Sequence, residues 1–107
     1  MKFANELYAG KIACRSKDRI IQDLNAGIYR EGFFVVALCS HRGALLEAIP
    51  VESYNEDVYR LYHNPDELQV VGLAITKREA VELMQEIVLD IYKKTKSFQV
   101  SAYFTFN

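Results

Sequence analysis

The feature that most constrains this fold is a short apolar segment that leads directly into a helix-capping pattern. Leu68 to Ile75 (LQVVGLAI) has the length and the β-branched content of a buried strand. Thr76 and Glu79 follow with the spacing of a capping box, in which the threonine hydroxyl accepts a hydrogen bond from the Glu79 amide and the Glu79 carboxylate accepts one from the Thr76 amide. The sequence therefore predicts a strand that is followed at once by a helix.

The predicted helix is amphipathic. Its apolar side is formed by residues at three- and four-residue spacing, namely Ala80, Val81, Met84, Ile87, Val88 and Ile91. Leu89 falls on the opposite side. Three lysines, at positions 93, 94 and 96, stand at the carboxyl end, where the helix dipole favours cations. We expect this helix to pack its apolar side against a sheet.

After this helix, the apolar residues recur with a period of two. From Phe98 to Phe106, apolar residues alternate with Gln99, Ser101, Tyr103 and Thr105, which is typical of a strand with one buried face. The segment contains no charge and no proline, the residues that usually protect an open sheet edge. We therefore expect this strand in the centre of the sheet or in a contact between subunits.

The first half of the chain predicts a helix and a hairpin. Ser16 can cap a helix whose apolar side is Ile20, Ile21, Leu24 and Ile28, and Gly32 ends it. Phe33 to Ser40 (FFVVALCS) is apolar without alternation, which is typical of a strand buried on both faces. A turn at residues 40–43 and a second strand from Ala44 to Ile49, stopped by Pro50, complete the hairpin.

Two segments fit more than one structure. Lys2 to Ala9 can form a short helix that Gly10 ends, with Lys11 to Cys14 as a short strand. Ser53 to His63 has a second capping-box pattern and helical spacing, although its last six residues also fit a strand. We favour the helix for this second segment.

These elements indicate one α+β domain. A length of 107 residues is typical of a single domain, and no repeat or linker divides the chain. The expected architecture is a two-layer sandwich, with a four- or five-stranded mixed sheet and two main helices on one face. If residues 11–14 form a strand, the order approaches a ferredoxin-like arrangement with an insertion. That fold hosts many unrelated functions and indicates none by itself.

Charge and composition argue against several classes of protein. The 13 Lys and Arg against 14 Asp and Glu give a formal net charge of −1, whereas a nonspecific nucleic-acid binder needs a basic excess. The longest apolar run, Phe33 to Cys39, is too short to cross a bilayer, and the N-terminus lacks the apolar stretch of a secretory signal. We expect a cytoplasmic protein in which Cys14 and Cys39 are reduced.

One cluster has the residue types of a nucleophilic enzyme. Cys39 and His41 can share one face of a strand, so that the imidazole could deprotonate the thiol. No third residue is indicated to orient the imidazole, and a buried cysteine beside a solvated turn is the simpler explanation. The cysteines and histidines lack metal-ligand spacing, and no glycine-rich phosphate loop is present. We therefore expect neither a metal nor a cofactor.

An anion site is a weaker hypothesis. Lys77 and Arg78 lie in the first turn of the long predicted helix, where free backbone amides could bind a phosphate or carboxylate beside them. Two solvated side chains are the simpler explanation. Nucleic acid could use the C-terminal lysines with Tyr103 as a stacking surface, but the neighbours of Tyr103 are neither aromatic nor basic.

Tyrosine provides the best functional lead. Tyr59, Arg60, Tyr62 and His63 are of the types that occur at the centres of protein interfaces, and Tyr103 is a further candidate. The competing explanation is that Tyr54 and Tyr62 complete the core under a loop while Tyr59 is half exposed. The sequence thus favours a non-enzymatic binding or interaction module that self-associates, with a dimer expected ahead of a different protein partner. The alternatives are an anion or nucleic-acid binder and, less favoured, a small Cys/His enzyme.

Overall fold

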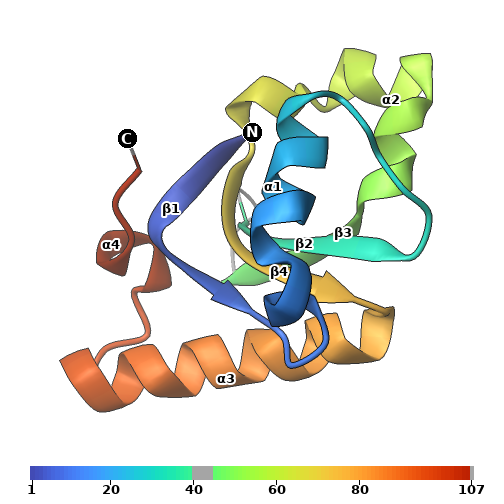
Figure 1. The fold of residues 1–107 in the computed structure, drawn as a ribbon. Coiled ribbons are helices and arrows are strands. Elements are labelled where there is room, and N and C mark those ends of the chain that lie inside the picture. Colours follow the sequence, from blue (N-terminus) through green and yellow to red (C-terminus); the bar gives the residue numbers. More distant parts are fainter. Residues whose placement is uncertain (40–44, 107) are drawn as a thin grey trace.

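The structure is a computed structural model that describes residues 1–39 and 45–106 (Figure 1). Its strands are β1 (Lys2–Ala9), β2 (Phe33–Leu38), β3 (Leu46–Pro50) and β4 (Gln69–Ile75). Its α-helices are α1 (Lys17–Asn25), α2 (Asp57–Tyr62), α3 (Lys77–Thr95) and α4 (Val100–Tyr103). Three short 3₁₀ helices complete the order: η1 (Ala13–Ser16), η2 (Val51–Asn55) and η3 (Pro65–Glu67). Within the described ranges, no helix is long and apolar enough to span a membrane.

The four strands form one mixed sheet in the order β1-β4-β2-β3. β1 runs parallel to β4, whereas β2 is antiparallel to both of its neighbours. The predicted hairpin is confirmed by the pairing of β2 with β3, in which Val35 lies opposite Ile49. Its turn, with His41 and Arg42, lies outside the described residues. The prediction of an α+β fold around a four-stranded mixed sheet is therefore confirmed.

The helices are placed differently from the prediction, because they cover both faces of the sheet rather than one (Figure 1). On one face, Val36 packs in a cluster with Leu83 and Ile87 of α3. On the other face, Val35 packs in a cluster with Ile20 and Leu24 of α1. The physical reason is visible in β2, where consecutive residues are apolar and fully buried, so that each face needs its own cover. The prediction that both main helices lie on one face, as in a ferredoxin-like sandwich, is therefore corrected.

The junction between β4 and α3 confirms half of the capping box. The Thr76 hydroxyl accepts a hydrogen bond from the Glu79 amide at 3.2 Å. The Glu79 carboxylate, however, does not reach back to the Thr76 amide, which instead donates to the Gly32 carbonyl at 3.0 Å. It accepts hydrogen bonds from three other backbone amides, those of Ile12, Ala13 and Ile75, at 3.0, 3.2 and 3.0 Å. Glu79 thus joins the start of α3 to the loop that follows β1.

We expect Thr76→Gly to stabilise the protein by about 1 kcal/mol and Thr76→Ala to destabilise it by about 1 kcal/mol. Thr76 has φ 82° and ψ 148°, a region that is essentially restricted to glycine and costs other residues about 1–3 kcal/mol. Glycine relieves this strain and weakens the cap by only about a few tenths of a kcal/mol, whereas alanine keeps the strain and loses the hydroxyl. Urea denaturation measures both effects, and a glycine variant less stable than the alanine variant would contradict the strain.

The C-terminal segment is not the long strand that its period of two predicts. Residues 100–103 form α4. Val100 and Phe104, which are four residues apart, therefore lie on the same side and pack in one core cluster with residues of α3. Phe98 is 54% exposed and stacks on Tyr92 with ring centroids 4.5 Å apart. Phe106 pairs as a strand would, through an antiparallel bridge to Ala4 of β1. The helix buries two large side chains at once, whereas the period of two in the sequence favoured a strand. The prediction of a central or intersubunit strand is therefore wrong.

The N-terminal segments also differ from the sequence-based expectation. Lys2–Ala9 is strand β1 rather than a short helix, and residues 13–16 form η1 rather than a strand. The helix expected after Ser16 is confirmed as α1, but it ends at Asn25, and Gly27 with φ 75° follows it. Ile28 is consequently 43% exposed rather than on a buried helix face.

Candidate functional site

The aromatic residues of the Tyr59–His63 segment belong to a continuous stack. The Tyr59 ring stacks on His63 with centroids 4.4 Å apart, and Tyr54 and Tyr59 meet in a T-shaped pair with centroids 5.1 Å apart. Tyr29 extends the stack to Tyr54 at 5.5 Å. Helical geometry explains the first contact, because residues four apart lie on one side of a helix turn. Tyr29 joins from a segment that the sequence patterns did not connect with this site.

A pocket of about 420 Å³ opens beside this stack, and we call it the tyrosine pocket. Its aromatic wall consists of Tyr54, Tyr59, Tyr62 and His63. Its polar groups come from β3, the loop after α2, η3, the first residue of β4 and α4: Glu47, Asn64, Glu67, Gln69 and Ser101. The volume lies within the range of small-molecule sites, about 300–1,000 Å³. The pocket lies at the end of the sheet where β4 begins, opposite the end at which Glu79 binds its amides.

Burial and charge act together on the tyrosines of the pocket. Burial raises the pKa of Tyr54 above its ordinary value, and Tyr59 and the Glu47 carboxylate raise it further. The pKa of Tyr59 is also raised, by burial first and then by Glu47. Both phenols therefore stay protonated and able to donate a hydrogen bond, and the Glu47 carboxylate gives this wall a negative potential.

The outer side of α2 carries an apolar surface beside the pocket. No residue of α2 is buried, and Val58, Leu61 and Tyr62 are 68, 79 and 77% exposed. We call these three residues the α2 surface. Arg60 has a structural role, since it donates to the Tyr54 carbonyl at 2.8 Å and pairs with Asp57. Four interface residues were predicted in this segment. The structure brings Tyr59, Tyr62 and His63 to the pocket, whereas Arg60 is bonded to the Tyr54 carbonyl.

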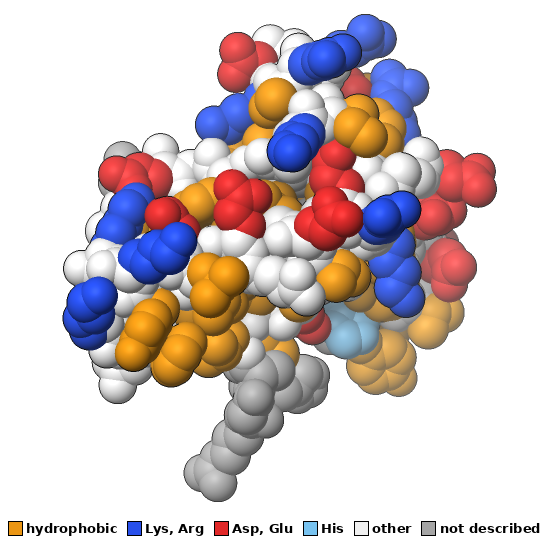
Figure 2. Space-filling model, turned by 90° about the horizontal axis from the view of Figure 1, so that it is seen from below, with side chains coloured by type: hydrophobic (Ala, Val, Ile, Leu, Met, Phe, Trp, Pro, Cys, Tyr) orange, Lys and Arg blue, Asp and Glu red, His pale blue; other side chains and the backbone are white. Residues whose placement is uncertain are grey.

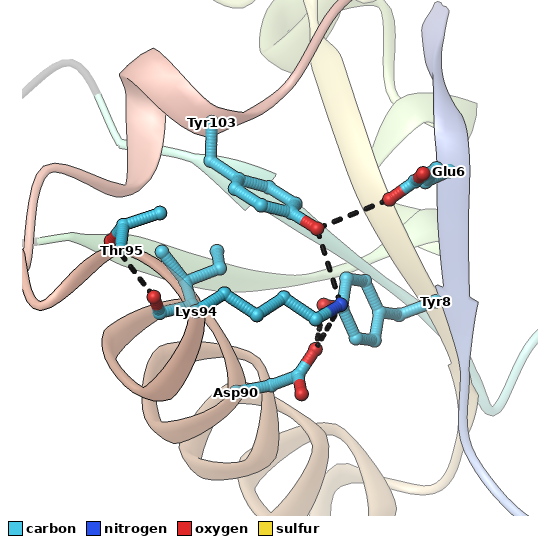
Figure 3. Close-up of polar contacts among 7 residues, drawn as sticks. Glu6, Tyr8, Asp90, Lys94, Thr95 and Tyr103 are labelled. Atoms are coloured by element: carbon cyan, nitrogen blue, oxygen red, sulfur yellow. Dashed lines mark hydrogen bonds and ion pairs between the residues drawn. The ribbon is translucent and has the colours of Figure 1, made fainter.

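Tyr103 lies away from this pocket wall, in a polar network between β1, α3 and α4 (Figure 3). The Tyr8 hydroxyl donates to the Asp90 carboxylate, and Lys94 Nζ lies 3.1 Å from Asp90 Oδ2. Lys94 also donates to the Tyr103 hydroxyl at 3.2 Å, and that hydroxyl donates to Glu6 at 3.2 Å. The hydrogen bond from Tyr8 and then that from Lys94 hold the pKa of Asp90 below its ordinary value. The network thus attaches the C-terminal segment to α3 and β1.

The predicted anion residues lie on the surface at the start of α3. Arg78 forms an ion pair with Glu82 at 3.3 Å, and its side chain is 90% exposed. Lys77 is also exposed. The Glu79 amide of this first turn is already bonded to the Thr76 hydroxyl. The anion hypothesis stays a prediction, without a second feature that points to a ligand.

The enzyme hypothesis depends on Cys39 and His41. Cys39 follows β2, is partly buried and lines the tyrosine pocket. His41 lies outside the described residues. The Cys39–His41 pair therefore stays a prediction from the sequence. In residues 1–39 and 45–106, no group of three or more His, Cys, Asp or Glu side chains is placed to hold a metal ion.

A second apolar surface lies between α3 and β3. A shallow groove of about 500 Å³ is lined mainly by Leu45, Leu46, Met84, Val88 and Leu89. Figure 2 shows the α3 side of the molecule, where apolar side chains gather beside acidic ones.

Comparisons with protein-family models, with curated proteins and with solved structures found no match to this chain. A function is therefore inferred from the geometry of its own residues.

Proposed function

We propose that this domain is a non-enzymatic interaction module that self-associates through the α2 surface. The observation that carries the proposal is that α2 buries none of its own residues yet exposes Val58, Leu61 and Tyr62. Packing within the domain gives no reason for large apolar residues at these positions. Contact with a second copy would remove them from water, and each fully buried side chain would contribute about 1.5–3 kcal/mol.

A twofold dimer fits this surface best, because a twofold axis brings the same patch of two copies together. α2 is also held in place without using its outer side. Arg60 fixes it to the Tyr54 carbonyl, and Tyr59 packs inward on Tyr54. The exposed side chains are therefore presented by a preorganised helix, which reduces the conformational entropy lost on association.

The anion or nucleic-acid alternative has less support. Two of the basic residues that it would use already pair within the chain, Arg78 with Glu82 and Lys94 with Asp90. Tyr103, its stacking candidate, is hydrogen bonded to Glu6 and lies within 5.6 Å of the Lys94 ammonium. These intramolecular contacts would have to be exchanged for contacts with phosphates.

We expect the wild-type protein to be a dimer and Leu61→Asp to be a monomer over a concentration series. The substitution places a charge at the centre of the proposed contact, and we expect it to weaken association by at least about a hundredfold. The measurement is light scattering on a size-exclusion column. Leu89→Asp, on the outer side of α3, is the matched control and should remain dimeric.

Two outcomes would contradict the proposal. A wild-type monomer at all accessible concentrations would remove self-association. Dissociation by Leu89→Asp but not by Leu61→Asp would move the contact to the groove between α3 and β3.

A further inference from the structure

The chemistry of the tyrosine pocket indicates the charge of a ligand. Two of the described lining residues, Glu47 and Glu67, carry carboxylates, and none of them is lysine or arginine. Glu47 also lies close enough to Tyr54 and Tyr59 to raise the pKa of both phenols. Among the described lining residues, an anion would meet two carboxylates and no lysine or arginine, whereas a cation would be attracted.

The aromatic wall has the same preference. The face of a tyrosine ring is negative, so that a cation within about 6 Å of the ring centre is attracted to it. Tyr54, Tyr59 and Tyr62 all line the pocket, and Tyr62 is 77% exposed at its rim. Tyr54 is 1% exposed and Tyr59 stacks one ring face on His63, so Tyr62 presents the most ring surface to an ammonium group.

Tyr54 supports a built site. Its side chain is only 1% exposed and lines the tyrosine pocket, and burial is the first cause of its raised pKa. The inner wall of the pocket is therefore a fixed, buried ring that need not be ordered when a ligand binds.

We propose that the tyrosine pocket binds an organic cation, an alkylammonium or guanidinium group held against the exposed Tyr62 ring and paired with Glu47. Such a group occurs in free small molecules and in side chains of peptides, and the pocket chemistry fits both sources. The inference does not rest on self-association: the pocket shares Tyr62 with the α2 surface, whereas Val58 and Leu61 do not line the pocket.

The first experiment compares matched ligands by isothermal titration and NMR. Choline represents the free cation, and its neutral isostere 3,3-dimethylbutan-1-ol has the same shape without the charge. N-acetyl-arginine amide represents a peptide side chain, and the corresponding citrulline compound is its neutral control. We expect one or both cations to bind at least about tenfold more tightly than their neutral partners. The tighter of the two identifies the source.

The second experiment tests the assigned residue. Glu47→Gln keeps the shape of the side chain and removes its charge, and we expect it to weaken cation binding by about tenfold. Glu52→Gln makes the same change in η2, outside the pocket, and should bind like the wild type. Near-ultraviolet circular dichroism of the tyrosines confirms that both variants keep the fold.

Three outcomes would overturn the inference: equal binding of charged and neutral ligands, equal loss in both glutamine variants, or no saturable binding of either cation. The monomeric variant Leu61→Asp should bind the cation at least as tightly as the wild type, because Tyr62, which the pocket shares with the α2 surface, is then free of the dimer contact. This last measurement separates the ligand site from the proposed dimer contact, because each can fail while the other stands.

Discussion

Glu79→Ala is expected to lower the free energy of unfolding by about 3–5 kcal/mol. The Glu79 side chain is buried, at 8% exposure, and its carboxylate accepts hydrogen bonds from the amides of Ile12, Ala13 and Ile75. Alanine would leave these donors without a partner in a largely buried position, and such unsatisfied groups cost about 1–3 kcal/mol each. The expected loss is below the sum because the loop after β1 can partly relax toward water.

Two variants make this measurement specific. Glu79→Gln keeps the size of the side chain but replaces one acceptor oxygen by a donor, so we expect it to lose most of the same stability. Glu82→Ala, in the next turn of α3, removes a carboxylate that pairs only with exposed Arg78 and should change stability by less than about 1 kcal/mol. Urea denaturation gives all three values. Equal effects of the two alanine substitutions would contradict the role assigned to Glu79.

The location of Glu79 also bears on where a ligand can bind. β1 and β4 are adjacent and parallel, and the helices that follow them cover opposite faces of the sheet. In open α/β sheets the crevice at the carboxyl ends of such strands commonly holds the ligand. Here the carboxylate of Glu79 occupies that place, and a Cβ on Gly10 would meet its atoms at 2.2–2.3 Å. The candidate pocket accordingly lies at the opposite end of the sheet.

Local patterns in the sequence predicted contacts between neighbours and missed those between distant segments. The Thr76 cap follows from a spacing of three residues and is confirmed. The amide partners of Glu79 at positions 12 and 13 lie 67 and 66 residues away, and no periodicity encodes them. The tyrosine pocket likewise combines one local contact with contacts between distant segments. The stack of Tyr59 on His63 follows from helical spacing, whereas the approach of Glu47 depends on strand order.

Two errors in the predicted elements have a common physical origin. The alternation from Phe98 to Phe106 fits a strand, but Val100 and Phe104 are also four residues apart, and burial under α3 selected the helical spacing. On α3, the buried face includes Leu83 in place of the predicted Val81, which is 42% exposed. In both segments two apolar faces were available, and tertiary packing decided between them.

The contact between Gly72 and Leu83 gives the second prediction. A Cβ on Gly72 would lie 2.9 Å from Leu83 Cδ2, so Gly72→Ala forces two fully packed groups together and should cost about 1–3 kcal/mol. Leu83 is 2% exposed, and Leu83→Ala should cost about 2–5 kcal/mol through lost burial and a cavity. Leu89→Ala, on the exposed side of the same helix, should cost less than about 1 kcal/mol.

The double variant decides whether these two effects share one contact. If the methyl group that Gly72→Ala adds enters the space that Leu83→Ala leaves, the overpacking disappears and part of the cavity is filled. The double variant should then be more stable than the sum of the single effects by about 1–2 kcal/mol, measured as the coupling energy of a double-mutant cycle in urea. Gly72→Ala with Leu89→Ala should be additive, since Leu89 lies outside the cluster that contains Leu83. Additivity in both cycles would show that β4 and α3 do not meet at Gly72 as closely as the structure has them.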